Sequence, residues 1–284
     1  MHFPTPLHRT RPSVQIAYRV ALFGFLLIWL SPLLAVVVTT IRPQADLANG
    51  NYWGLPSGFA LFENVHDVFA GSPMVLFFFN SVVITDTVVA AVLALGTLAG
   101  FALAKYRFWG RTLIYATFIG GNFVPNQILM IPVRDLVVAT GLYDTIWSLV
   151  LFHTAFQTGF ATLFLRNFIT NLPGELFEAA RIEGASELQI LRMIVIPLIR
   201  PALAGLAVLV FTFVWNDYFW SLVLVQSDAA KPITLGLAGL KGEFLSAWNI
   251  ISAGALLAAL PPVAMFFLMQ KHFVAGLTAG AVKG

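Results

Sequence analysis

The charged side chains best placed to do chemistry gather in one short segment, which runs from Glu178 to Pro197. It is the densest cluster of charge in a chain of 284 residues, of which 59% are hydrophobic and only 10% charged. Glu178 and Arg181 have the i,i+3 spacing of an ion pair on one helix. Because it is so charged, the segment cannot itself cross a bilayer. Its chemistry is therefore predicted to be ion pairing and contact at a membrane face.

None of the common catalytic motifs occurs in the sequence. No Lys follows a Gly, so a Gly-x-x-x-x-Gly-Lys-Ser/Thr phosphate loop is absent, as are a His-Glu-x-x-His helix and a Gly-x-Ser-x-Gly elbow. Without cysteine there is no thiolate metal site and no disulfide framework. We therefore predict that the chain is not an enzyme, hydrolyses no ATP and holds no metal or cofactor. Its net charge of +3 is no signal of nucleic-acid binding.

Turn residues divide the charged segment into two predicted short helices with a hinge between them. The first helix ends at Gly184, which suits the left-handed position just after a helix. Ser186 and Gln189 have the spacing of a capping box for the second helix, which Pro197 ends. The first helix has one apolar face. The residues of that face are Leu176, Phe177 and Ala180.

Long apolar runs surround the segment and predict an integral membrane protein. The mean hydropathy is +0.86, and soluble domains carry roughly 25% charged residues. A spanning helix needs ~20 mostly apolar residues. The stretches that meet this length are 16–40, 74–104, 112–133, 143–166, 201–225 and 250–271. The predicted fold class is an all-α membrane protein with six transmembrane helices, in a single domain covering 1–284.

Lys and Arg residues are concentrated on one side of the six predicted spans. That side holds both termini, the 105–111 loop and the 167–200 loop. Its basic residues are Arg9, Arg11, Arg19, Lys105, Arg107, Arg111, Arg166, Arg181, Arg192, Arg200, Lys271 and Lys283, whereas the other side has Arg42, Arg134, Lys231 and Lys241. Cytoplasmic loops are enriched in basic residues, so both termini are predicted to be cytoplasmic. The N-terminal apolar run lacks a small-x-small cleavage site and is predicted to remain as the first span.

The charged segment resembles a known motif. It contains a Glu-Ala-Ala triplet, a Gly six positions after the Glu, and an Ile-x-hydrophobic-Pro end. These residues are Glu178, Ala179, Ala180, Gly184, Ile194, Ile196 and Pro197. The spacing resembles the EAA loop of ABC importer permease subunits, with Ile196 where Leu is usual. The resemblance implies a type I importer permease fold and a coupling helix that docks on an ATPase. The docking residues are then Leu176, Phe177, Glu178, Ala179, Ala180, Arg181 and Gly184.

Other stretches resemble permeases of carbohydrate importers, a group that includes the smaller permease of the maltose importer. They are 125–132, 141–142, 144–145, the Trp-Asn-Asp-aromatic run 215–220 and the small, weakly basic tail 272–284 with Lys271 before it. At Gly159 many relatives carry Pro, so this sequence departs from the pattern there. The resemblance implies import of a sugar or a related polar solute. The alternative solutes are glycerol phosphate, an amino acid or a peptide.

The resemblance also implies an assembly in the bacterial inner membrane. Its parts are a second, different permease, two ATPase subunits that bind ATP and Mg, and a periplasmic or lipid-anchored solute-binding protein. Closure of the ATPase dimer moves the coupling helix, and the cavity then changes sides. The sequence does not favour a secondary transporter, because no clear inverted repeat is found. Nor does it favour an exporter, which more often carries its ATPase in the same chain.

Polar residues inside the predicted spans are candidates for the solute pathway. Asn216 and Asp217 lie roughly 22 Å along the fifth span, where they can meet sugar hydroxyls or, equally, form a polar seam between two permeases. Asp86 is either a clasp to another helix or a pathway residue. His153 and Gln157 are expected to hydrogen-bond between helices, and Trp220 to lie in an aromatic belt. The pathway candidates are Trp215, Asn216, Asp217, Tyr218, Asn80 and Asp86.

Overall fold

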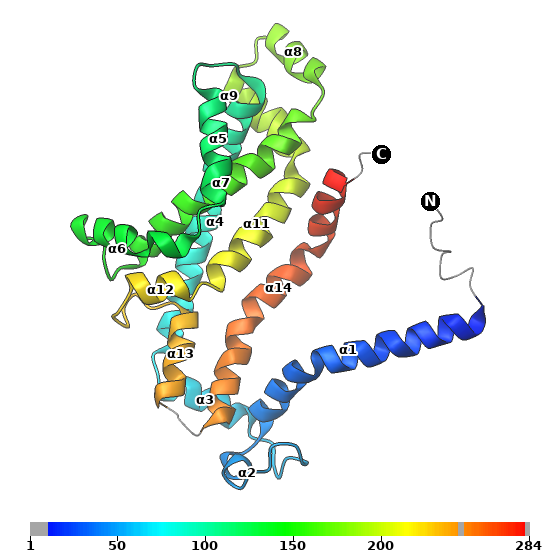
Figure 1. Ribbon diagram of the computed structural model, residues 1–284, viewed down its shortest axis with the longest axis vertical. Helices are drawn as coiled ribbons and strands as arrows, with labels where there is room; N and C mark the ends of the chain where they lie inside the picture. The colour runs from blue at the N-terminus through cyan, green and yellow to red at the C-terminus, as the bar shows by residue number, and fades with distance from the viewer. Residues whose placement is uncertain (1–10, 244–246, 282–284) are drawn as a thin grey trace. The chain divides into compact units, whose positions relative to one another are not determined.

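The computed structural model describes residues 11–243 and 247–281, with the backbone alone at 126, 241–243 and 271–281. Every regular element in these ranges is a helix (Figure 1), which confirms the predicted all-α class. The described residues fall into two compact units. The first unit comprises the chain up to Gly71 together with Leu240–Leu257, and the second comprises Ser72–Gly239 together with the chain from Ala258 on.

The first unit is organised around one buried cation. Its helices are α1 (Pro12–Ile41), α2 (Gln44–Ala48), α3 (Leu61–Ala70) and the first part of α14 (Trp248–Ala281). The guanidinium of Arg42 donates to the carbonyls of Asn51 and Gly54 and lies 3.8 Å from the carboxylate of Asp46. Asn64 of α3 in turn donates to the carbonyl of Arg42 at 2.9 Å. These bonds hold the loop that joins α1 to α3.

The second unit is built on three long helices that lie side by side, α4 (Met74–Lys105), α7 (Ile146–Thr170) and α11 (Arg200–Trp215) (Figure 1). Shorter elements join them. These are α5 (Arg111–Asn122), a 3-10 turn (Asn126–Leu129), α6 (Met130–Ala139), α8 (Gly174–Ile182), α9 (Glu187–Ile190), a π-helical turn (Leu191–Val195), α10 (Ile196–Leu198), α12 (Phe219–Leu224) and most of α13 (Ile233–Glu243).

Four of the described helices are long and apolar enough to cross a membrane, namely α1, α4, α7 and residues 248–270 of α14. A fifth follows if Glu187–Leu198 and α11, which meet at a bend of 78°, count as one span. The predicted third span, 112–133, is not one helix, because α5 ends at Asn122 and Pro125 precedes a new turn. Proline lacks an amide hydrogen and disfavours a helical residue before it. The 12 residues of α5 extend only ~18 Å.

The last helix is longer than the sequence predicts. The sixth span was expected over 250–271 with a tail over 272–284, whereas α14 continues to Ala281. Residues 282–284 lie outside the described residues. So do Arg9 and the side chains of Lys241, Lys271 and Lys283, on which part of the predicted orientation rests.

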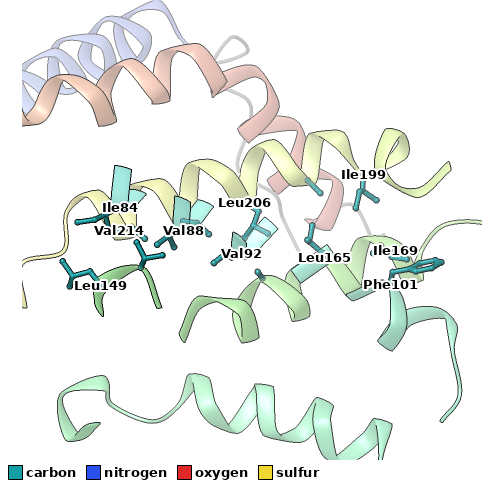
Figure 2. Packing of buried hydrophobic residues seen from close by; sticks show 14 of the residues in the cluster. Ile84, Val88, Val92, Phe101, Leu149, Leu165, Ile169, Ile199, Leu206 and Val214 are labelled. Carbon is teal, nitrogen blue, oxygen red and sulfur yellow. The ribbon is translucent and has the colours of Figure 1, made fainter. Parts of the chain in front are cut away.

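Close packing of α4 against α7 forms the centre of the second unit. Gly96 and Gly100 lie one turn apart on α4. A Cβ on Gly96 would lie 2.8 Å from the Cβ of Ala161, and one on Gly100 would lie 3.2 Å from the backbone nitrogen of Arg166. Small residues of this kind let helix backbones approach in a membrane. The buried cluster around this contact includes Ile84, Val88, Val92, Leu149, Leu165, Leu206 and Val214 (Figure 2).

Replacing Gly96 with Ala should lower the stability of the chain, although Ala favours a helix over Gly by about 1 kcal/mol. The added methyl group would meet Ala161 far inside contact distance, and overpacking of this kind costs about 1–3 kcal/mol. Gly159→Ala on α7 is the matched control, because its Cβ would lie an ordinary 3.5 Å from Phe118. The measurement is the melting temperature of the purified protein in detergent. A Gly96→Ala variant that melts no lower than Gly159→Ala would contradict the packing argument.

Candidate functional site

A cavity of about 900 Å³ opens in the second unit between α5, α7, α11 and α12. Half of its lining residues are aromatic, and Phe156, Phe213 and Tyr218 are examples. Its polar residues are Asn122, His153, Gln157, Thr212, Asn216 and Asp217. A cavity of several hundred Å³ with an apolar wall and a few polar groups is typical of a site for a small molecule.

The polar part of the wall exists because the chain breaks between α11 and α12. Asp217 lies in this break, and its carboxylate accepts from the N–H groups of Trp220 at 3.3 Å and Ser221 at 3.0 Å. The first turn of a helix has no internal acceptors for these groups. The Ser221 hydroxyl also donates to the carboxylate at 3.0 Å, and Nε2 of His153 on α7 lies 3.5 Å away. Asp217 thus starts α12 and ties it to α7.

Asn216 and Tyr218 reach the same cavity with fewer contacts inside the chain. The side-chain nitrogen of Asn216 donates to the carbonyl of Thr212 at 2.8 Å. Its side-chain oxygen has no hydrogen-bond partner among the described residues. Tyr218 is 44% exposed. Of the pathway candidates that line the cavity, these two have exposed side chains and are available to a ligand.

Trp215 and Asn80 have other roles in the described structure. Trp215 is buried, and its indole N–H donates to the carbonyl of Ala258 at 3.0 Å. The amide of Asn80 donates to the carbonyls of Ala229 and Lys231, both at 3.0 Å. Neither residue lines the cavity. Asn80 therefore anchors the loop that follows α12 to the first turns of α4.

Ser81, which follows Asn80, and Asp86, the last pathway candidate, also lie on α4. The hydroxyl of Ser81 accepts from the N–H of Ile233 at 2.8 Å, which fixes the start of α13. Asp86 is exposed and lies away from the cavity wall. The structure therefore brings Asn216, Asp217 and Tyr218 together and leaves Asp86 apart.

Two further wall residues have positions that bear on the sequence expectations. The 3.5 Å approach of His153 to Asp217 agrees with the predicted role of His153 between helices. Trp220 is only 2% exposed, and its ring lies 3.8 Å from that of Phe152, so it is not in an exposed belt. Because α12 is a separate short helix, it turns Trp220 inward against α7. The prediction assumed one continuous helix over 201–225, and the periodicity of such a helix does not predict that Trp220 points inward.

The predicted helix, hinge and second helix are all present in the charged segment. Gly184 follows α8 with a φ of +83°, which confirms the left-handed conformation expected there. Ser186 and Gln189 form the reciprocal capping box. The second helix contains a π-helical turn just before Pro197. Proline removes a backbone donor, and wider helical turns accommodate such a loss.

The apolar face predicted on α8 is mostly covered by this chain itself. Phe177 is 2% exposed and Ala180 is 9% exposed. The ammonium group of Lys105 lies 3.8 Å from the ring of Phe177. In contrast, Leu176 is 42% exposed and Ile182 is 87% exposed. Sequence periodicity identified a face but not what it contacts, and Ile182 was overlooked although it is an apolar residue off that face.

Glu187 joins three elements at the hinge. Its carboxylate accepts from Nε and Nη2 of Arg181 at 2.8 and 3.3 Å and from the hydroxyl of Tyr106 at 2.5 Å. The i,i+3 pair of Glu178 with Arg181, expected from spacing, is replaced by this two-point contact, which carboxylates and guanidinium groups favour. Burial and the hydrogen bond to Glu187 raise the pKa of Tyr106 to about 12, so its hydroxyl stays a donor. The same carboxylate raises the pKa of Arg181.

The described residues combine apolar spans with a cavity of aromatic and polar side chains, an arrangement that suits a membrane transport component. The chain belongs to the family of binding-protein-dependent transport system inner membrane components, whose model matches residues 93–279. It is a permease subunit and not an enzyme. The resemblance drawn from the EAA loop is thereby confirmed at the level of the family.

Relatives extend over nearly the whole chain. It is 34% identical to the osmoprotective compounds uptake permease protein GgtD of Synechocystis, over 95% of this chain and 92% of that protein. It is 32% identical to the lactose transport system permease protein LacG of Rhizobium radiobacter, over 98% and 99%. It is also 32% identical to the arabinooligosaccharides transport system permease protein AraQ of Halalkalibacterium halodurans, over 89% and 91%.

The fold resembles that of a solved transporter chain. The match is to the crystal structure of a bacterial ABC transporter involved in the import of the acidic polysaccharide alginate, with a TM-score of 0.81 and 24% identity. It covers 96% of this chain and 100% of that chain. The likeness establishes a common fold.

Replacing Gly184 with Val should impair transport while the spans remain inserted. At a φ of +83° a β-branched side chain is strained by roughly 1–3 kcal/mol, although space around the Cβ is open. Gly184→Asn should be milder, since Asn tolerates this conformation. Gly174→Val is the control, because Gly174 has equal space and no positive φ. Solute uptake and ATPase retention on membranes are the readouts. Equal uptake by Gly184→Val and wild type would show that the turn at Gly184 is not needed for transport.

Proposed function

We propose that this chain forms half of the translocation pathway of an ATP-driven importer for a sugar or a related polar solute. The observation that carries the proposal is the cavity beside the α11–α12 break. Its carboxamide at Asn216 can hydrogen-bond hydroxyl groups, and its aromatic rings offer apolar surfaces to the faces of a pyranose. The relatives named for lactose and for arabinooligosaccharides support a sugar.

A second candidate solute is an osmoprotective compound. It is favoured by the relative in Synechocystis, which is named for uptake of such compounds. The carboxamide of Asn216 can hydrogen-bond a polar solute of either kind. The relatives named here do not favour an amino acid, a peptide or glycerol phosphate.

The proposed topology has six membrane crossings with both termini in the cytoplasm of a bacterial cell. Four crossings correspond to α1, α4, α7 and α14, a fifth to α11 with α12, and the sixth to the broken stretch of α5 and α6. In this arrangement α8 lies at the cytoplasmic face. The excess of Lys and Arg on that side supports the orientation.

The proposed partners are a second, different permease, two ATPase subunits that bind ATP and Mg, and a periplasmic or lipid-anchored solute-binding protein. The family description itself names a binding-protein-dependent system. The alginate transporter has been solved in complex with a periplasmic protein that holds an alginate pentasaccharide. A comparable complex is what this chain is proposed to enter.

Coupling is proposed to run from the ATPase through α8 to α4. The exposed side chains of Leu176 and Ile182, with those of Glu178 and Ala179 between them, are the proposed docking surface. Lys105 at the end of α4 donates to the carbonyl of Leu172 at 3.3 Å and covers Phe177. With the Tyr106–Glu187–Arg181 contact, these bonds make the end of α4 and α8 move together.

Asn216→Ala should reduce uptake by about two- to tenfold, the equivalent of one net hydrogen bond, without loss of the complex. Asp217→Ala should instead lower the melting temperature, because it leaves buried N–H groups of α12 without acceptors at a cost of ~1–3 kcal/mol. Calorimetry of the binding protein against disaccharides, arabinooligosaccharides and osmoprotective compounds selects the labelled solute. Uptake into proteoliposomes then compares the variants. Undiminished uptake by Asn216→Ala would place the solute elsewhere.

Ile182→Glu should lower the amount of ATPase that stays bound to the permease by roughly tenfold or more. Burying an Ile side chain in an interface stabilises the complex by about 1.5–3 kcal/mol, and this contribution would be lost. Leu188→Glu is the matched control, since Leu188 is 52% exposed on α9 beyond the hinge. Phe177→Ala should chiefly destabilise the chain itself. Co-purification of the ATPase with the tagged permease is the measurement. Full ATPase recovery with Ile182→Glu would refute this docking surface.

A further inference from the structure

The exposed face of α4 carries a single carboxylate within an apolar stripe. Val75 is 50% exposed, Phe79 61% and Val83 44%, at i,i+4 spacings that keep them on one side of the helix. Asp86 falls on the same stripe and is also exposed. The other faces of α4 pack against α7 and α11. The stripe is therefore what α4 presents outside its own bundle.

Asp86 lies deep in a membrane-spanning helix. α4 has 32 residues and extends ~48 Å, and Asp86 is about 5 Å from its midpoint. The hydrocarbon core is ~30 Å thick. A charged side chain at such a depth is costly in lipid, and spanning helices place it against protein or in a wet cavity. The side of α4 that carries Asp86 is therefore not expected to face lipid alone.

The rest of the second unit offers Asp86 neither of these environments. No hydrogen bond or ion pair of Asp86 occurs among the described residues, and the nearest polar side chains on the helix, Asn80 and Ser81, bond to the 229–233 loop. The cavity is lined by α5, α7, α11 and α12, and no described residue of α4 lies on its wall. A partner for the carboxylate must come from beyond this unit.

We propose that the stripe Val75, Phe79, Val83 and Asp86 packs against the second permease subunit, which presents a cation or an N–H or O–H donor to Asp86. This inference rests on the proposed function, which supplies the second permease. The apolar residues give close contact over several turns of helix. The carboxylate fixes which partner helix fits and in what register, since a helix without a donor would leave a charge buried and unpaired.

Cysteine crosslinking tests this contact directly, because the chain has no native cysteine. Single cysteines replace Val75, Phe79 and Val83 in the assembled complex, with Leu151→Cys as control, since Leu151 is 53% exposed on α7. A short bismaleimide should link the stripe positions to cysteines in the spans of the second permease, at least threefold more than position 151. Crosslinks only to α1 of this chain, or rapid labelling by a charged, membrane-impermeant thiol reagent, would overturn the proposal.

Substitutions at Asp86 give an independent outcome. Asp86→Leu should lower the recovered amount of the permease pair by roughly two- to tenfold, the range of one lost hydrogen bond, while Asp86→Asn should retain more. A lipid-facing position predicts the reverse, because Leu would then improve recovery. Equal or higher recovery with Asp86→Leu refutes the contact. If wild type itself forms no pair with a second permease, the proposed function fails and not this assignment alone.

Discussion

The close approach of α4 and α7 is the contact on which the second unit depends. A Cβ on Gly96 would clash with Ala161 and one on Gly100 would be tight against the α7 backbone, so the absence of both lets the two helices approach closely. This fixes α7, and α7 in turn supplies His153 and much of the aromatic wall of the cavity. In a membrane, helix association relies on packing rather than on exclusion of water. Filling these two positions would therefore disturb the cavity as well as the core.

The polar groups of the second unit divide into those that hold the chain and those that remain available. Asp217, Asn80 and Ser81 satisfy backbone groups at breaks between helices. Such groups have no water to bond within lipid and need partners in the protein. Asn216 has an oxygen left unused by the described residues and faces the cavity. One short Trp-Asn-Asp run thus contains both a structural acceptor and a candidate ligand contact.

Much of this arrangement could be predicted from the sequence. The hinge at Gly184 and the cap at Ser186 followed from local turn chemistry, which depends on few neighbours. Periodicity located the long helices but could not say which side of α8 is covered, because Phe177 is buried by residues distant in sequence. Likewise, the spacing predicted that Arg181 pairs with Glu178, but Arg181 pairs with Glu187, which also accepts a hydrogen bond from Tyr106. Tyr106 is distant in sequence, so local spacing could not show this. The stretch 112–133 was expected to be one span, but the chain breaks around Pro125, because hydropathy does not show where a proline ends a helix.

α4 also has the form of a lever with unequal arms. Two tight approaches to α7 lie at Gly96 and Gly100, and from the point between them Tyr106 lies ~12 Å away while Ser81 lies ~26 Å away in the other direction. If a rigid α4 pivots at this contact, a displacement at the Tyr106 end is roughly doubled where Asn80 and Ser81 grip the 229–233 loop. A small stroke at α8 would then become a larger excursion of the chain that follows α12, the helix on the cavity wall.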